Sequence, residues 1–209
     1  MQKTPDLWTA TYEAKTQEEL DQAYCRWVDK YDHDTRTVMG YVGPDLAAAM
    51  LDYHLDSSES KVLDVGCGTG LVGEVLHSMG YENIEATDVC QDMLSEAEKK
   101  DVYDRVFQSD LSQRICVPNN NYDATICVGT FTYAHVGPEA FRELVRVTKP
   151  DGYICFTIRD GAYEDYGYRA KMVELEAGNQ WELQEMRTAD YLVKENVQAR
   201  FCTYKVIEG

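Results

Sequence analysis

From residue 61 onward, short apolar runs alternate with segments in which apolar residues recur every three or four positions. The runs are typical of buried strands, and the segments between them have the spacing of helices that pack one face on a sheet. Strands joined by such helices must run parallel, because each connection has to cross back over the sheet. The pattern predicts a doubly wound α/β sheet with strands at 62–65, 84–88, 105–111, 122–129 and 153–159.

The carboxyl-terminal part departs from this rhythm. A helical segment at 161–177 is followed by extended segments at 181–187 and 198–206, with no helix of crossover length between the two. Two strands connected so directly should pair antiparallel. We therefore expect a Rossmann-like, seven-stranded sheet that is mostly parallel and ends in an antiparallel pair.

The amino-terminal pattern is helical and unusually aromatic. Residues 1–11 show no periodicity and are expected to form a loose entry segment, whereas Thr16 and Glu19 have the spacing of a capping box. The apolar face that follows contains Tyr24, Trp27 and Tyr31. A second helix begins near Pro44, and a polar loop ends at residue 60. We expect residues 1–60 to form a helical cap and connecting loop on a body of residues 61–209, and the aromatic face either packs on that body or acts as a lid.

Composition limits the class of protein. With 209 residues, 44% of them hydrophobic, the chain suits a single domain that buries roughly 70% of its unfolded surface. A net charge of −17 disfavours binding to nucleic acid or anionic membranes, and no apolar run is long enough to span a bilayer. The first residues lack a secretory signal. These features predict a cytoplasmic or nucleocytoplasmic protein.

The seven cysteines contain no Cys-x-x-Cys pair, which argues against a zinc site. Their odd number disfavours a closed disulfide framework, and several fall in predicted strands, where a free thiol packs as a small hydrophobe. We expect reduced, structural thiols and no bound metal.

The strongest candidate site follows the first strand. Asp64 precedes a loop that contains Gly66, Gly68 and Gly70, and glycine lets a ligand approach backbone N–H groups closely. In an open α/β sheet, ligands bind beyond the carboxyl ends of the strands. Asp88 ends the second strand at a spacing suited to the two hydroxyls of a ribose. The two features predict a ligand that contains adenosine.

Two cofactor classes fit such a loop. Residues 68–73 match the glycine spacing of a dinucleotide-binding turn, so a nicotinamide-dependent oxidoreductase is a rival interpretation. A pyrophosphate would be repelled by the nearby Asp64 carboxylate. S-adenosylmethionine has no phosphate and carries an ammonium and a sulfonium, which an acidic strand end stabilises. The charges favour S-adenosylmethionine.

These residues resemble a known family. Residues 64–70 resemble the first motif of class I S-adenosylmethionine-dependent methyltransferases, and residues 86–88 resemble the second. Residues 109–111, 122–129 and 149–153 are similar to later motifs of the same family. Segments 27–34 and 129–136 are similar to the methyltransferase-like proteins of the Williams-Beuren syndrome region. Cys90 departs from the family pattern, because a helix-capping serine is commoner there.

The resemblance implies a set of site residues. Asp88 is implied as the ribose ligand and Asp110 as the adenine contact, and we expect the aromatic helix to contribute as well. The cofactor-binding residues are expected to be Asp64, Gly66, Cys67, Gly68, Gly70, Asp88, Val89, Met93, Asp110, Leu111, Val128, Trp27 and Tyr31.

The acceptor is less well defined. Tyr133 and His135 follow the fourth strand and are candidates to orient or deprotonate an acceptor, and Thr130, Arg159 and Tyr163 are expected to face its pocket. Motifs of amino-methylating and cytosine-C5 nucleic-acid enzymes are absent, so we expect a small-molecule or protein acceptor. A methyltransferase-like scaffold that binds the cofactor without transferring a methyl group is the alternative. The sequence does not indicate the oligomeric state.

Overall fold

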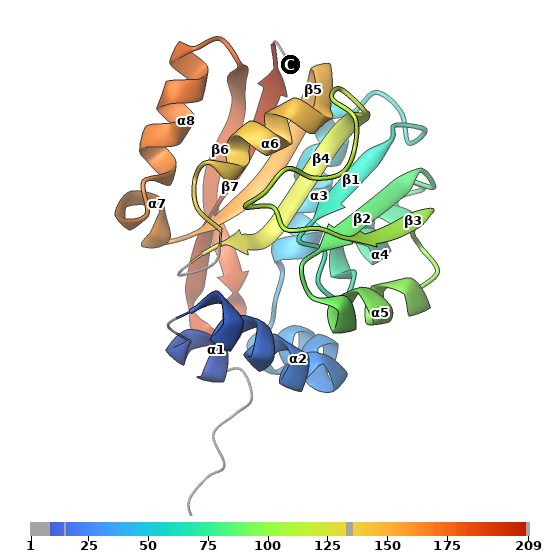
Figure 1. Cartoon of the computed structure of the whole chain (residues 1–209), viewed down its shortest axis with the longest axis vertical. Helices are drawn as coiled ribbons and strands as arrows, with labels where there is room; N and C mark the ends of the chain where they lie inside the picture. Colours follow the sequence, from blue (N-terminus) through green and yellow to red (C-terminus); the bar gives the residue numbers. More distant parts are fainter. Residues whose placement is uncertain (1–8, 15, 133–135, 208–209) are drawn as a thin grey trace, which may run out of the picture.

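The computed structural model describes residues 9–14, 16–132 and 136–207 and contains one seven-stranded sheet (Figure 1). The spatial order of the strands is β3-β2-β1-β4-β5-β7-β6. The strands are β1 (Val62–Val65), β2 (Ile84–Asp88), β3 (Arg105–Gln108), β4 (Tyr122–Phe131), β5 (Thr148–Arg159), β6 (Trp181–Leu192) and β7 (Val197–Val206).

The directions of the strands confirm the predicted fold class. Strands β1 to β5 pair in parallel, whereas β7 pairs antiparallel with both β5 and β6. The chain moves outward in one direction from β1 to β3 and then returns to place β4 on the other side of β1. This reversal opens a crevice at the carboxyl ends of β1 and β4, where ligands bind in sheets of this kind.

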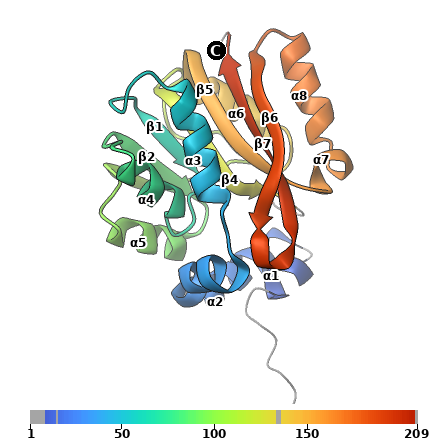
Figure 2. The same ribbon diagram turned by 180° about the vertical axis from the view of Figure 1, so that it is seen from behind.

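Helices cover both faces of the sheet. Figures 1 and 2 show α3, α4 and α5 on one face and α6 and α8 on the other. A cluster of aromatic rings fills the interface between the sheet and the helices α6 and α8. In this cluster Trp181 stacks on Tyr204, with ring centroids 4.1 Å apart. These helices are α3 (Gly43–His54), α4 (Leu71–Ser78), α5 (Gln91–Lys99), α6 (Ala140–Val147), α7 (Ala162–Asp165) and α8 (Tyr168–Ala177), and a short 3₁₀ turn, η2 (Val193–Glu195), joins β6 to β7.

The amino-terminal helices α1 (Thr9–Glu13) and α2 (Gln17–His33) form a layer beyond the end of the sheet toward which β4 points (Figure 1). The hydroxyl of Thr16 accepts a hydrogen bond from the N–H of Glu19, as the capping pattern predicts. Helix α2 continues into a π-helical turn, η1 (Asp34–Met39), where the indole of Trp27 donates to the carboxylate of Asp34 over 2.9 Å. A cap of helices thus faces the crevice. Helix α3 packs on β4 and β5, and the boundary at residue 60 stays a prediction.

Several predicted element limits were wrong. The helix predicted at 161–177 is two helices, because Gly167 adopts a φ of 76° between α7 and α8. Strand β5 begins at Thr148 rather than at residue 153, so it includes residues 149–152, among which Asp151 has a φ of 65°. Strand β6 runs on to Leu192, β4 to Phe131, and β3 ends at Gln108. Residues 9–11 belong to α1, whereas the rest of the predicted entry segment lies outside the described residues.

Candidate active site

The glycine loop after β1 has the backbone geometry that only glycine adopts easily. Gly66, Gly68 and Gly70 have φ values of 69°, 54° and 89°. A Cβ on Gly66 would lie 2.2 Å from Oγ1 of Thr130, whereas one on Gly68 would meet no atom within 4 Å. The loop therefore packs tightly against β4 at Gly66 and borders open space at Gly68.

Asp88, at the end of β2, ties this loop to the start of α5. One carboxylate oxygen accepts the N–H of Gly68 over 2.8 Å, and the other accepts the N–H of Cys90 over 2.9 Å. Cys90 is the N-cap residue of α5 but makes no side-chain capping bond. The Asp88 carboxylate thus satisfies two backbone donors at the point where the loop and the helix meet.

A cavity of about 420 Å³ lies at this point, between the sheet and α2. Most of the cofactor-binding residues expected from the sequence line it, and these are Gly66, Gly68, Asp88, Val89, Met93, Asp110, Leu111, Val128 and Tyr31. Other wall residues include Leu20, Tyr24, Thr87 and Cys90. Among its described residues the wall contains two carboxylates, those of Asp88 and Asp110, and no Lys, Arg or His side chain. We call this the larger cavity.

Four expected residues do not line the larger cavity: Asp64, Cys67, Gly70 and Trp27. Asp64 is 1% exposed and accepts a hydrogen bond from the Tyr103 hydroxyl over 2.7 Å. Burial raises the pKa of its carboxyl to about 7, although the Tyr103 bond opposes the rise. The contact between Asp64 and Tyr103 lies beneath the glycine loop. The binding roles of all four residues stay predictions.

Gly73, the third glycine of the dinucleotide-like spacing, accommodates Tyr103. A Cβ on Gly73 would lie 2.2 Å from the Tyr103 ring, and the Gly73 N–H donates to the Tyr103 hydroxyl over 3.2 Å. The hydroxyl in turn donates to Asp64. Packing of one tyrosine against α4 therefore accounts for this glycine.

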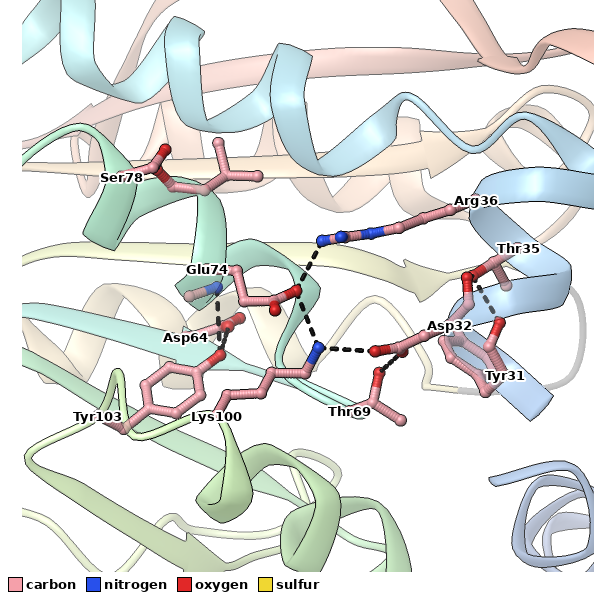
Figure 3. Close-up of polar contacts among 12 residues, drawn as sticks. Tyr31, Asp32, Thr35, Arg36, Asp64, Thr69, Glu74, Ser78, Lys100 and Tyr103 are labelled. Carbon is pink, nitrogen blue, oxygen red and sulfur yellow. Dashed lines mark hydrogen bonds and ion pairs between the residues drawn. The ribbon is translucent and has the colours of Figure 1, made fainter. Parts of the chain in front are cut away.

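A chain of charged side chains joins the cap to the glycine loop (Figure 3). Asp32, near the end of α2, accepts hydrogen bonds from the hydroxyl of Thr69 in the loop and from Lys100, the latter over 2.6 Å. Lys100 also pairs with Glu74 of α4 over 2.8 Å, and Glu74 pairs with Arg36 of η1 over 2.6 Å. Asp32 of α2 thus contacts the glycine loop at Thr69, and Arg36 of η1 contacts α4 at Glu74.

A second cavity, of about 280 Å³, adjoins the first. Tyr24, Tyr31 and Gly129 line both. The hydroxyls of Tyr41 and Tyr191 lie 2.9 Å apart, and a Cβ on Gly129 would approach each of them to about 3 Å. The remaining wall includes Trp27, Phe131, Thr132, Thr157, Arg159 and Tyr166. We call this the smaller cavity.

The residues expected to face the acceptor pocket do not all line the same cavity. Thr130 lines the larger cavity and Arg159 the smaller one, but Tyr163 lines neither and its ring lies 4.2 Å from the Arg200 guanidinium. The two catalytic candidates, Tyr133 and His135, lie outside the described residues.

The positions of Tyr41 and Tyr191 in the wall of the smaller cavity are not predicted by the sequence. They are 150 positions apart and meet because Tyr41 forms an isolated antiparallel bridge with Leu192. No local motif marks such a contact. The aromatic face of α2 was the available signal for Tyr24, which lines both cavities.

Within the described ranges, no group of three or more His, Cys, Asp or Glu side chains is arranged to hold a metal ion. No helix in the same ranges is long and apolar enough to cross a membrane.

Comparison with known proteins gives consistent similarities. Residues 63–156 match the methyltransferase domain family. Human methyltransferase-like protein 27 is 33% identical over 166 residues, which are 76% of this chain and 66% of that protein. Malonyl-[acyl-carrier protein] O-methyltransferase of Pectobacterium atrosepticum is 32% identical over 50% of this chain and 41% of its own length. The chain thus spans about two thirds or less of these relatives.

Solved structures share the fold. An S-adenosylmethionine-dependent methyltransferase from Aquifex aeolicus is 20% identical, with a TM-score of 0.61 over 86% of this chain and 97% of that chain. A chain from a complex that contains the Haloferax volcanii Trm112 methyltransferase activator is 14% identical, with a TM-score of 0.68 over 88% of this chain and 98% of that chain.

Proposed function

Because the chain belongs to the class I S-adenosylmethionine-dependent methyltransferases, we propose that it binds S-adenosylmethionine in the larger cavity and methylates an acceptor held in the smaller one. When bound, this cofactor supplies an electrophilic methyl group on a sulfonium. The acceptor is a small molecule or a protein side chain, because a cavity of about 280 Å³ is at the small end of ligand sites.

The charge of the larger cavity is the observation that supports this proposal most directly. Its described wall offers the carboxylates of Asp88 and Asp110 and no basic side chain. The negative charge of this wall disfavours a dinucleotide pyrophosphate, which would have no basic side chain as a partner, and favours a cofactor that carries a sulfonium and an ammonium. Thr87 also lines the cavity, and its buried hydroxyl has no hydrogen-bond partner within the described part of the protein. The wall thus suits a cationic nucleoside and leaves a polar group for it.

Each wall residue has a role in this proposal. The carboxylate of Asp88, fixed by two backbone N–H groups, binds the ribose hydroxyls, and its hydrogen bonds are charge-assisted. Val89, Met93 and Leu111 line the same cavity and would contact the faces of the adenine ring. One carboxylate oxygen of Asp110 accepts the N–H of Ser112 over 2.7 Å, and the other would accept a hydrogen bond from the adenine amino group.

Positioning is the main contribution of the protein to the transfer step. Methyl transfer is an in-line displacement, for which aligning the acceptor and excluding water provide much of the acceleration. Burial raises the pKa of Tyr31 and of Tyr41 well above the ordinary value, so both phenols stay protonated and serve as hydrogen-bond donors. Tyr133 and His135 remain the proposed groups for orienting or deprotonating the acceptor.

The acceptor class and the location of the protein are proposed from its charge and sequence. The net charge of −17 disfavours nucleic acid as the acceptor. A cytoplasmic location, extending to the nucleus, is proposed from the sequence.

Titration calorimetry tests the cofactor assignment. We expect S-adenosylmethionine and S-adenosylhomocysteine to bind and NAD to bind far more weakly. Asp88→Ala should weaken S-adenosylhomocysteine binding by roughly one to two orders of magnitude, because charge-assisted hydrogen bonds to the ribose are lost. Asp56→Ala, in the exposed loop before β1, is the matched control and should leave the affinity unchanged.

Unchanged affinity of the Asp88 variant, or tighter binding of NAD, would refute the assignment. Cofactor binding without methylation of any member of a broad acceptor panel would instead favour the scaffold alternative.

A further inference from the structure

The described walls of the two cavities carry opposite charge. The described wall of the larger one contains two carboxylates and no basic side chain. The described wall of the smaller one contains the guanidinium of Arg159 and no Asp or Glu side chain. Arg159 is the last residue of β5 and is only partly exposed. Thr157, two residues earlier on the same face of the strand, accepts the N–H of Gly129, where the two cavities meet.

We propose that the smaller cavity binds an acceptor that carries a carboxylate on a compact apolar or aromatic body, with Arg159 as the residue that selects the carboxylate. This inference rests on the proposed function, because it names the substrate class of the same site. The guanidinium has five N–H donors in a planar fork, and two of them match the oxygens of a carboxylate.

The aromatic rings in the wall of the smaller cavity are the reason for proposing an acceptor with an apolar or aromatic body. Trp27 and Tyr31 of the cap meet edge to face with centroids 4.7 Å apart, and Tyr41 and Tyr191 do so at 4.9 Å. Both pairs line the smaller cavity. Rings held in this way present rigid apolar surface at little conformational cost, and the hydroxyls of the tyrosines can donate to oxygen acceptors.

Two effects oppose the binding of a carboxylate, and both are weaker than its attraction to the Arg159 guanidinium. The net charge of −17 repels anions, but charges more than about 8 Å away are largely screened at physiological salt, whereas Arg159 lies in the cavity wall. Aromatic rings also attract ammonium groups. An ammonium within a cavity of about 280 Å³ would lie close to the guanidinium and be repelled by it. A carboxylate is therefore favoured over an amine.

Binding of a matched compound series tests the proposal. Phenyl, 4-hydroxyphenyl, cyclohexyl and hexyl bodies are each tested as the acetic acid, its primary amide and the corresponding amine. Affinity is measured by ligand-detected NMR on protein saturated with S-adenosylhomocysteine. At least one carboxylate should bind about tenfold or more tightly than its amide and amine.

Variants assign the preference to one side chain. Arg159→Gln should remove the preference for the carboxylate, and Arg159→Lys should retain part of it, because the charge remains without the planar fork. Arg187→Gln, which removes an exposed guanidinium of β6 that lines neither cavity, should retain all of it.

Three results would overturn the inference: equal binding of carboxylate and amide, tighter binding of the amine, or no binding by any carboxylate. A carboxylate preference that survives in the Arg159→Gln variant would overturn it as well. S-adenosylhomocysteine affinity, measured for every variant by calorimetry, separates this failure from failure of the proposed function and reports whether the variant is folded.

Discussion

Replacing Asp64 by Asn should change how the stability of the protein depends on pH. The carboxyl of Asp64 is 1% exposed, and burial raises its pKa from 3.8 to about 7 in the folded protein. In the unfolded chain it ionises near pH 3.9. Between these values the folded state keeps a proton that the unfolded state releases, so raising the pH lowers the free energy of unfolding.

The size of the effect follows from the two pKa values. A difference of about three pH units corresponds to about 4 kcal/mol, of which about 3 kcal/mol falls between pH 5 and pH 8. An Asn at position 64 cannot ionise, and its amide oxygen can still accept the Tyr103 hydroxyl. The variant should therefore gain about 3 kcal/mol relative to the wild type as the pH rises over this range.

Urea denaturation followed by tryptophan fluorescence at several pH values measures this difference. Any pH-independent cost of the amide displaces the two curves by a constant and leaves their changing separation intact. Asp123→Asn is the control: burial opposes ionisation there, but the Lys149 ammonium together with the backbone N–H and the charge of Lys61 outweighs it and lowers the pKa of Asp123. Its titration lies below pH 5, so its difference from wild type should be flat. Parallel curves for the Asp64 variant and the wild type would show that Asp64 is already ionised at pH 5.

Three further outcomes are expected. Gly73→Ala should lower the free energy of unfolding by about 1–3 kcal/mol in urea, because a methyl group would displace the Tyr103 ring; an unchanged midpoint would contradict the packing. S-adenosylhomocysteine should increase the hydrogen-exchange protection of α2, and identical protection would argue against a lid. Mild diamide oxidation should join Cys25 to Cys90, whose sulfur atoms lie 3.2 Å apart, and peptide mass spectrometry should detect that pair and lose it in Cys25→Ser.

The sequence was informative where the signal was local and periodic. Alternating strands and helices predicted the sheet, and glycine spacing with Asp88 predicted where the cavity lies, because each feature reflects backbone demands within a few residues. The role of Asp64 in cofactor binding stays a prediction, and the structure adds a contact that no local pattern predicts: its carboxylate accepts a hydrogen bond from the hydroxyl of Tyr103, 39 positions away.

The smaller cavity required the structure. Tyr41, Tyr191 and Arg159 come from segments far apart in the chain, and Tyr41 reaches Tyr191 because it bridges to Leu192 at the end of β6. The split between α7 and α8 was also missed, because the apolar spacing continues across Gly167 while its backbone does not continue the helix.

Tyr24 and Tyr31 lie on one helix and form part of the wall of both cavities. Two ligands that share such a wall also share the free energy of ordering it. The ligand that binds first bears the free-energy cost of ordering the wall, and the second ligand then binds to a wall that is already ordered. Linkage requires such an effect to be mutual, so under the proposed function the affinity for the methyl donor would rise by the same factor when the acceptor is bound. One helix would then couple the occupancy of the two sites, and departure of either product would weaken the binding of the other.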